Sequence, residues 1–428
     1  MKLNGMPLQR LFPLSLQHVF AMFGATILVP ILTGLNPLTA LFTSATGTLI
    51  FHGVTGGKVP AYLGSSFAFI APIIAVSVGV EAGGMGLGMA AATGACIIAG
   101  LIYLLTGALV KIVGLETIQR FIPAVVVGPV IMTIGLGLAG VAEFMASQNL
   151  FIAVVTLVAA IIVSMYAKGF LRVIPILVGM LTGYLVTILL QVPALQNIAF
   201  VQRLLPERLI DFAQVQQAAW FALPRFVSEA AYGTTTGAEF LFPRFALPAI
   251  LVIAPIAIVT MVEHLGDMLA ISKTTEIDFL EKPGLHRTLT GDGLATAWAG
   301  FFGGPPNTTY GENIAVLAIT KVFNPVVVQA AAVMILIFSL SPKVGALLNT
   351  IPNAVKGGIA VLLFGMIAAV GIRTLVDKQV DLSKVRNLII VSTTLILGIS
   401  GIALFGIQGM GLGAIVGILL NIILPDRS

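Results

Sequence analysis

The segment Pro306-Asn-Thr-Thr-Tyr-Gly-Glu-Asn-Ile-Ala315 decides the fold, because polar residues and β-formers interrupt an apolar stretch there. A second segment, Pro60-Ala-Tyr-Leu-Gly-Ser-Ser-Phe-Ala-Phe69, repeats this pattern. Each opens with proline and then becomes an apolar helical run, which predicts a short β-strand followed by a half-helix. Backbone groups at membrane depth must find partners inside the protein, so we expect the two strands to pair with each other.

The composition indicates that these segments lie in a lipid bilayer. Of the 428 residues, 58% are hydrophobic and 9% are charged, whereas a soluble domain carries about 25% charged residues. The basic residues stand singly or in pairs between apolar runs, as in the loops of membrane proteins, so no nucleic-acid partner is expected. Cys96 is the single cysteine, and no group of histidines, cysteines and carboxylates has metal-ligand spacing. We therefore predict no internal disulfide and no metal site.

The apolar runs predict an all-α integral membrane protein with fourteen transmembrane segments, because a bilayer core needs about 20 apolar residues per helix. Their expected starts lie near residues 14, 37, 62, 87, 122, 150, 170, 246, 287, 307, 326, 354, 388 and 408. Lysine and arginine gather in alternate connections, such as residues 373–386, while the short connections between these have few. Since basic loops stay in the cytoplasm, we expect both termini to be cytoplasmic.

A weak internal repeat divides the chain into two halves. An offset of 246 residues places His18 on His264 and brings the two interrupted segments into correspondence. Seven predicted segments, an odd number, separate the copies, so the halves must cross the membrane in opposite directions. Such inverted seven-segment repeats are typical of secondary transporters, which bind substrate near the midplane where spans are broken. We expect the half-helices to begin near Phe67 and Asn313, where N–H groups without helical partners can bind carbonyl oxygens of a ligand.

Three carboxylic acids stand out within the predicted segments. Glu312 belongs to the second interrupted segment, and Glu263 and Asp267 lie in the segment 246–272. A charged side chain in the bilayer costs roughly 2.5–3.5 kcal/mol or more, so such residues are functional candidates. Glu263 and Asp267 share one helix face. Their mutual repulsion and their burial disfavour two charges, so we expect one of them to hold a proton, as proton coupling requires. Pairing with a buried cation or a backbone N–H remains the alternative.

Other polar residues surround these acids in the predicted segments. His264 joins the proton-coupling group, although its position about 100° round the helix from the first acid favours a packed core histidine. Gln17 and His18 are expected to brace the broken spans by hydrogen bonds, with plain helix packing as the alternative. Ser66 and Asn313 lie in the interrupted segments, and we expect them to support the site.

Five motifs carry a resemblance to a known family. They are Ser15-Leu-Gln-His18, Pro60-Ala-Tyr-Leu-Gly-Ser-Ser-Phe-Ala-Phe69, Glu263-His-Leu-Gly-Asp267, Pro283-Gly-Leu-His-Arg287 and Asn307-Thr-Thr-Tyr-Gly-Glu-Asn313. Together they resemble the nucleobase–ascorbate transporters, also called the nucleobase–cation symporter-2 family, over nearly the whole chain. Within that family they are most similar to the bacterial uracil permeases.

The resemblance implies a domain organisation and a mode of action. It implies a core domain built from residues 1–113 and 244–350, and a gate domain built from residues 114–243 and 351–428. It also implies a homodimer in the bacterial cytoplasmic membrane that imports a nucleobase together with a proton by alternating access. The coupling ion is then the proton, and no cofactor is expected.

The resemblance also assigns the substrate-binding residues. Glu263 and Glu312 match the acids that hydrogen-bond the base in the family. Phe67 and Gly311 match positions that offer backbone groups, and Tyr310 precedes the second acid by two residues, as in the uracil carriers.

The match to the uracil carriers is mixed at two positions. Uracil carriers often have histidine where this chain has Asp267, whereas purine carriers have aspartate there but glutamine in place of Glu312. Uracil is therefore the predicted substrate, with xanthine or another purine as the alternative. An anion transporter of similar architecture would carry a cationic residue within a span, and the sequence places none there. No nucleophile–base pair or set of metal ligands indicates an enzyme.

Overall fold

The computed structural model describes residues 2–3, 6–77, 85–114, 123–196, 202, 204, 210–224, 242–405 and 407–425. Both chain ends and most of the long predicted connection between residues 191 and 244 lie outside the described residues. The cytoplasmic position of the termini therefore stays a prediction.

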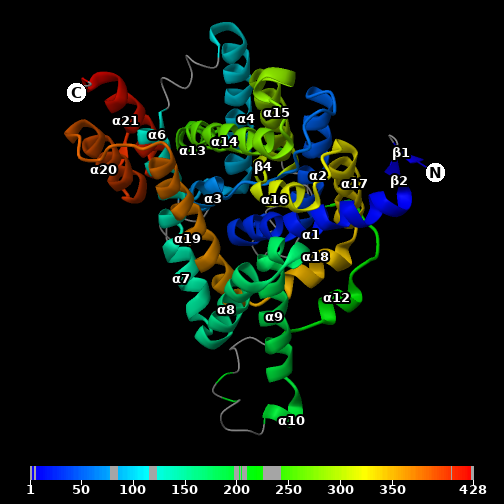
Figure 1. Ribbon diagram of the computed structural model, residues 1–428. Coiled ribbons are helices and arrows are strands. Elements are labelled where there is room, and N and C mark those ends of the chain that lie inside the picture. The colour runs from blue at the N-terminus through cyan, green and yellow to red at the C-terminus, as the bar shows by residue number, and fades with distance from the viewer. Residues whose placement is uncertain are drawn as a thin grey trace.

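The described residues are mainly helical (Figure 1). In the first half, the helices are α1 (Leu8–Thr33), α2 (Pro37–Val54), η1 (Phe67–Phe69), α3 (Ile70–Ser77), α4 (Gly88–Val113), α6 (Ala124–Gly137), α7 (Ala139–Ser147), α8 (Leu150–Tyr166), η3 (Gly169–Val173), α9 (Pro175–Leu190), α10 (Pro193–Gln196) and α12 (Ala213–Gln217). In the second half they are α13 (Leu247–Ile253), α14 (Ile256–Thr275), η5 (Leu280–Gly284), α15 (Leu285–Phe302), α16 (Gly311–Thr320), α17 (Pro325–Ser339), α18 (Pro342–Asn349), α19 (Asn353–Asp377), α20 (Val385–Ile399) and α21 (Gly409–Ile423).

Several of these helices can cross a membrane. Among the described residues, five are long and apolar enough, and the bent pair α17 and α18, which meet at 82°, makes a sixth. Further apolar helices, such as α8 and α9, are shorter than a bilayer needs in a straight crossing. The chain is therefore a multi-pass helical membrane protein, while the count of fourteen segments stays a prediction.

Three short antiparallel strand pairs accompany the helices. They are β1 (Lys2–Leu3) with β2 (Met6–Pro7), β3 (Leu63–Ser65) with β4 (Asn307–Thr309), and β5 (Ala403–Leu404) with β6 (Ile407–Gln408). The pairing of β3 with β4 joins the two interrupted segments, as predicted. Leu63 lies opposite Thr309, and Ser65 lies opposite Asn307.

Each strand of the β3–β4 pair leads into a half-helix, and Figure 1 shows α3 and α16 on either side of β4. The first half-helix begins at Phe67, as predicted, through the turn η1. The second begins at Gly311 instead of the predicted Asn313. The reason is that the extended backbone of Tyr310, with φ −101° and ψ 119°, ends the strand and caps the helix immediately.

The outer edges of the β3–β4 pair are satisfied by side chains from α2 and α15. Ser44 donates a hydrogen bond to the Leu63 carbonyl over 2.7 Å, and the Leu63 N–H donates to the Thr48 hydroxyl over 3.0 Å. On the other strand, Thr296 donates to the Asn307 carbonyl over 2.8 Å. These bonds explain how a two-stranded sheet can exist at this depth without exposed backbone groups.

The helices pack in two groups. In one, α15 packs against α2 and α4, and α1, α13 and α17 join them. In the other, α19 packs against α6, α7 and α8, and α20 and α21 join through α6. These groups correspond in sequence to the expected core and gate parts, although that division itself remains a prediction.

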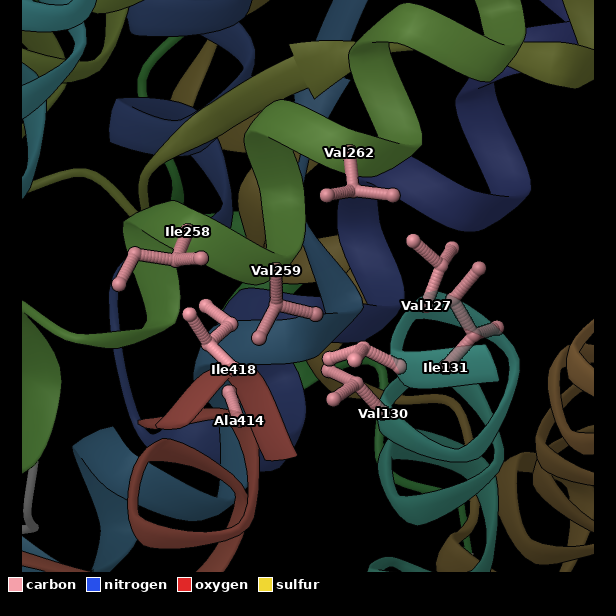
Figure 2. A pocket seen from close by; sticks show the side chains of 9 residues that line it. Val127, Val130, Ile131, Ile258, Val259, Val262, Ala414 and Ile418 are labelled. Carbon is pink, nitrogen blue, oxygen red and sulfur yellow. The ribbon is translucent and has the colours of Figure 1, made fainter. Parts of the chain in front are cut away.

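The predicted segment 246–272 forms one apolar helical span, Leu247–Thr275, with a turn near its start. It consists of α13 and α14, separated by a turn at Ala254 and Pro255. Helix α14 then packs against α6 and α21 of the other group. Figure 2 shows a small apolar gap at this contact, where Val259 and Val262 of α14 face Val130 of α6 and Ile418 of α21.

Candidate functional site

Helix α14 has one partly accessible face and one buried face. Glu263 and Asp267 lie on the first and are half-buried, which confirms that the two acids share a face. His264 and Met268, on the second face, are fully buried. The acids therefore keep accessible surface although they lie in the middle of a long apolar helical segment.

The start of α16 presents the third acid beside this face. Gly311 is exposed and Glu312 is half-buried, whereas Tyr310 and Asn313 on either side are buried. A side chain at Gly311 would place its first carbon 4.0 Å from Asp267 Oδ1. Asp267 thus lies next to the N-terminus of α16, where a carboxylate is stabilised by the helix dipole.

The three carboxyl groups of Glu263, Asp267 and Glu312 act on one another electrostatically, because each lies within range of the other two. In the described part of the chain, no lysine or arginine forms an ion pair with any of them. This argues against the alternative that a buried cation neutralises them. Protonation of one member would relieve their repulsion, and pairing with backbone N–H groups at the start of α16 remains the alternative.

The start of the first half-helix, η1, contributes a single accessible position. Phe67 is partly exposed, while Ser66 and Ala68 on either side are buried. Helix α14 packs against η1, β4 and α16 together. The predicted substrate-binding positions at Phe67, Gly311 and Glu312 therefore belong to elements that all pack against α14.

The buried face of α14 is anchored to β4. His264 Nδ1 lies 3.0 Å from Thr309 Oγ1 and 3.2 Å from Asp292 Oδ2, and of these two contacts only the first has hydrogen-bond geometry. His264 therefore faces away from the accessible acids, in agreement with the interpretation as a packed core histidine. Its role in proton coupling stays a prediction.

The end of the second break is braced by α1. Asn313 Nδ2 lies 3.0 Å from His18 Nδ1 and donates to the His18 carbonyl over 3.2 Å. The prediction that His18 braces a broken span is confirmed. The side-chain carbonyl oxygen of Gln17 has no hydrogen-bond partner among the described residues, and its bracing role stays a prediction.

Tyr310 occupies a supporting position. Its hydroxyl accepts a hydrogen bond from Thr26 over 3.2 Å and donates to the Ser65 carbonyl over 2.9 Å. The side chain is also 3% exposed, so both its surface and its hydroxyl are already used within the protein. The structure therefore gives Tyr310 a supporting role, and its contact with substrate stays a prediction.

A comparison with known proteins places the chain in a family. A family model described as a permease family matches residues 9–407. The chain belongs to this permease family. The uracil permease of Bacillus caldolyticus is 45% identical over 429 residues, which cover 97% of this chain and 92% of that protein. The uracil permease of Escherichia coli K12 is 39% identical and covers 92% of this chain and 86% of that protein.

The fold of the permease is also found among solved structures. The transmembrane domain of a cyanobacterial bicarbonate transporter, BicA, has a TM-score of 0.62 at 17% identity, covering 99% of this chain and 98% of that domain. SLC26A9 has a TM-score of 0.64 at 13% identity, covering 96% of this chain and 64% of that one. At such low identity the likeness shows a shared fold alone. The family match confirms the predicted resemblance and a transporter in place of an enzyme.

Two buried residues of the permease were missed in the sequence. Asp292, within α15, is fully buried and lies against His264. A lone aspartate between two glycines inside an apolar segment was the available signal. His52 is also buried, with Nε2 3.1 Å from the Ala61 carbonyl and Nδ1 3.3 Å from Gln329 Nε2. These contacts join α2 and α17 to the chain that enters β3.

Proposed function

We propose that this permease is a proton-coupled symporter that imports uracil across the bacterial cytoplasmic membrane. The observation that carries the proposal is the gathering of Glu263, Asp267 and Glu312 around the exposed start of α16, where no lysine or arginine among the described residues forms an ion pair with them. The relatives named uracil permeases, which match most of this chain, supply the identity of the substrate.

The chemistry of uracil fits these groups. The base carries two N–H donors and two carbonyl acceptors. The carboxylates of Glu312 and Glu263 can accept hydrogen bonds from its N–H groups. The backbone N–H groups at Phe67 and Gly311, at the starts of η1 and α16, can donate to its carbonyl oxygens. A planar ring could then be held by its edge between the two half-helices.

Proton coupling follows if the base binds well in only one protonation state of the acids. With all three carboxyls charged, their repulsion opposes any ordered arrangement. A proton taken from outside relieves this repulsion and allows binding, and its release inside weakens binding there. This reciprocal dependence links the two fluxes, because each ligand changes the affinity for the other by the same factor. The proton is the coupling ion, and the proposal includes no cofactor.

The proposed transport cycle needs two bodies that move relative to each other. We assign them to the core part, residues 1–113 and 244–350, and the gate part, residues 114–243 and 351–428, within fourteen segments in two inverted repeats. The apolar contact of α14 with α6 and α21 supports this division, because it contains β-branched side chains and no ion pair is found there among the described residues. Following the family resemblance, we place both termini in the cytoplasm and propose a homodimer.

Two other substrates compete with uracil. Xanthine is favoured by Asp267, since the purine carriers of the family have aspartate there. A small anion is suggested by the fold shared with the bicarbonate transporter. An anion would need a cationic group at the site, whereas this site presents carboxylates, so we rank it last.

The test is uptake by the purified protein in proteoliposomes with an inward proton gradient. We expect labelled uracil to accumulate, excess unlabelled xanthine or bicarbonate to compete poorly, and a protonophore to abolish accumulation but not exchange of uracil across the membrane. Preferential uptake of xanthine would show that xanthine, and not uracil, is the substrate. Accumulation that survives the protonophore would overturn proton coupling.

A further inference from the structure

A closed ring of hydrogen bonds ties the two broken spans to α1. Ser65 Oγ donates to the Thr26 carbonyl over 3.1 Å. The Thr26 hydroxyl donates to the Tyr310 hydroxyl over 3.2 Å, and the Tyr310 hydroxyl donates to the Ser65 carbonyl over 2.9 Å. Thr26 and Ser65 are fully buried and Tyr310 is 3% exposed. The three residues form what we call the Thr26 clamp.

The clamp is packed tightly against β3. A Cβ atom added to Gly64 would collide with the ring of Tyr310 and would lie 2.7 Å from the Thr26 hydroxyl. The Tyr310 ring therefore lies directly on the backbone of β3, in space that only a glycine leaves. The packing against Gly64 fixes the Tyr310 ring, and the hydrogen bonds fix its hydroxyl.

The clamp joins the positions from which both half-helices start. Tyr310 is the residue that caps α16, and Gly311 and Glu312 follow it directly. On the other strand, Ser65 is followed by Ser66, which caps η1 and its accessible Phe67. The clamp is therefore a second link between the two half-helix starts, beside the backbone bonds of β3 and β4.

We propose that Thr26 is a positioning residue that sets the fit of the base between the two half-helix starts, and thereby selects uracil over a larger purine. The inference rests on the proposed function, because that function places the base there. Thr26 does not touch the base. It acts through Tyr310, since a helical threonine would otherwise bond a carbonyl one turn back, and here it reaches the second broken span.

The experiment compares five variants of the full-length protein in detergent: Thr26→Val, Thr26→Ser, Tyr310→Phe, the double variant Thr26→Val/Tyr310→Phe, and Thr93→Val. Thr93 is a matched control, because it is a buried threonine whose hydroxyl bonds the Met89 and Ala90 carbonyls of its own helix. Equilibrium binding of uracil and of xanthine is measured by calorimetry, and thermal unfolding is followed in parallel.

We expect Thr26→Val to weaken uracil binding by up to about tenfold, since the whole of one hydrogen bond is the upper limit for a residue that acts through another, and to lower the preference for uracil over xanthine. Thr26→Ser should restore most of both, because it keeps the hydroxyl. Thr93→Val should leave both unchanged. The double variant Thr26→Val/Tyr310→Phe should bind no more weakly than the weaker of its two single variants, since one ring is broken in each case.

Two results would overturn the inference while leaving the proposed function in place. One is wild-type affinity and preference in Thr26→Val. The other is an equal loss in Thr26→Val and Thr93→Val that follows thermal stability alone. Absence of uracil binding by the wild-type protein would instead overturn the proposed function, and the clamp's role in selectivity would fall with it.

Discussion

The two broken spans have the same backbone plan and different chemistry. Each consists of a strand of three residues followed by the start of a half-helix. The first offers one partly accessible side chain, Phe67, and no ionisable group. The second offers the exposed Gly311 and the half-buried Glu312, and Asp267 of α14 lies beside its start. The shared backbone builds the site, while the second break supplies most of its hydrogen-bonding and proton chemistry.

This comparison predicts that changes in the second break have the larger effects. Replacement of Glu312 by alanine should abolish uracil binding, because the substitution removes a carboxylate acceptor from the site while burying no new polar group. Calorimetry and ligand-induced thermal stabilisation measure the effect. Glu143→Ala, at an exposed glutamate of α7, is the matched control and should bind normally. Normal uracil binding by Glu312→Ala would show that the second break does not supply the main hydrogen-bonding group of the site.

Loss of the hydrogen bonds between Asn313 and His18, which hold the second break against α1, should have the next largest effect. Asn313→Leu keeps a similar volume but leaves His18 Nδ1 without its partner and removes the second hydrogen bond of the His18 carbonyl. Each buried polar group left unpaired costs about 1–3 kcal/mol, so we expect a lower Tm and weaker uracil binding. Thermal unfolding of the purified protein measures the Tm, and calorimetry measures the binding of uracil. An unchanged Tm would show that helix packing alone holds α16 in place.

Much of this arrangement could be predicted from the sequence. The prolines and the polar interruptions in segments 60–69 and 306–315 predicted two strands and their pairing, because unpaired backbone is not tolerated at membrane depth. The spacing of Glu263 and Asp267 predicted their common face, since helical periodicity is regular. Both inferences depend on local pattern, and both are confirmed by the structure.

Side-chain partners that are distant in sequence could not be predicted. Nothing local indicates that Tyr310 points at Thr26 and Ser65, or that Asp292 lies against His264. The start of α16 was also misplaced, because a change of backbone direction at one residue decides where a helix begins. Such contacts depend on how α1, α14 and α15 pack, and packing follows from the whole chain.

Asp267→Asn should have an intermediate effect, and it tests how far the chemistry of the second break extends into α14. The position of Asp267 one helical turn after Glu263 favours a role in tuning the proton on that acid. The structure instead places Asp267 Oδ1 beside Gly311. We therefore expect a few-fold weaker uracil binding and a shifted preference between uracil and xanthine.

Equilibrium binding, counterflow and proton-driven uptake of the same reconstituted Asp267→Asn variant separate the two roles. Direct contact predicts changes in binding and base preference. Tuning predicts normal binding and counterflow with impaired accumulation, because the amide removes a charge that repels the neighbouring acid. Normal results in all three assays would make Asp267 a structural residue.

The smallest effect is expected in the first break, at Ser66. This residue is fully buried, and its N–H donates to the Pro306 carbonyl over 2.8 Å, but its hydroxyl has no hydrogen-bond partner in the described part of the chain. Ser66→Ala keeps the backbone bond and removes a buried hydroxyl that nothing satisfies. Since an unsatisfied buried group is costly, we expect an equal or slightly higher Tm and uracil binding within about twofold of wild type.

Thermal unfolding and calorimetry of Ser66→Ala provide the measurements, with Asn313→Leu as the contrasting variant. A strong loss of binding would mean that the Ser66 hydroxyl bonds the base or an ordered water, and that the first break contributes side-chain chemistry after all.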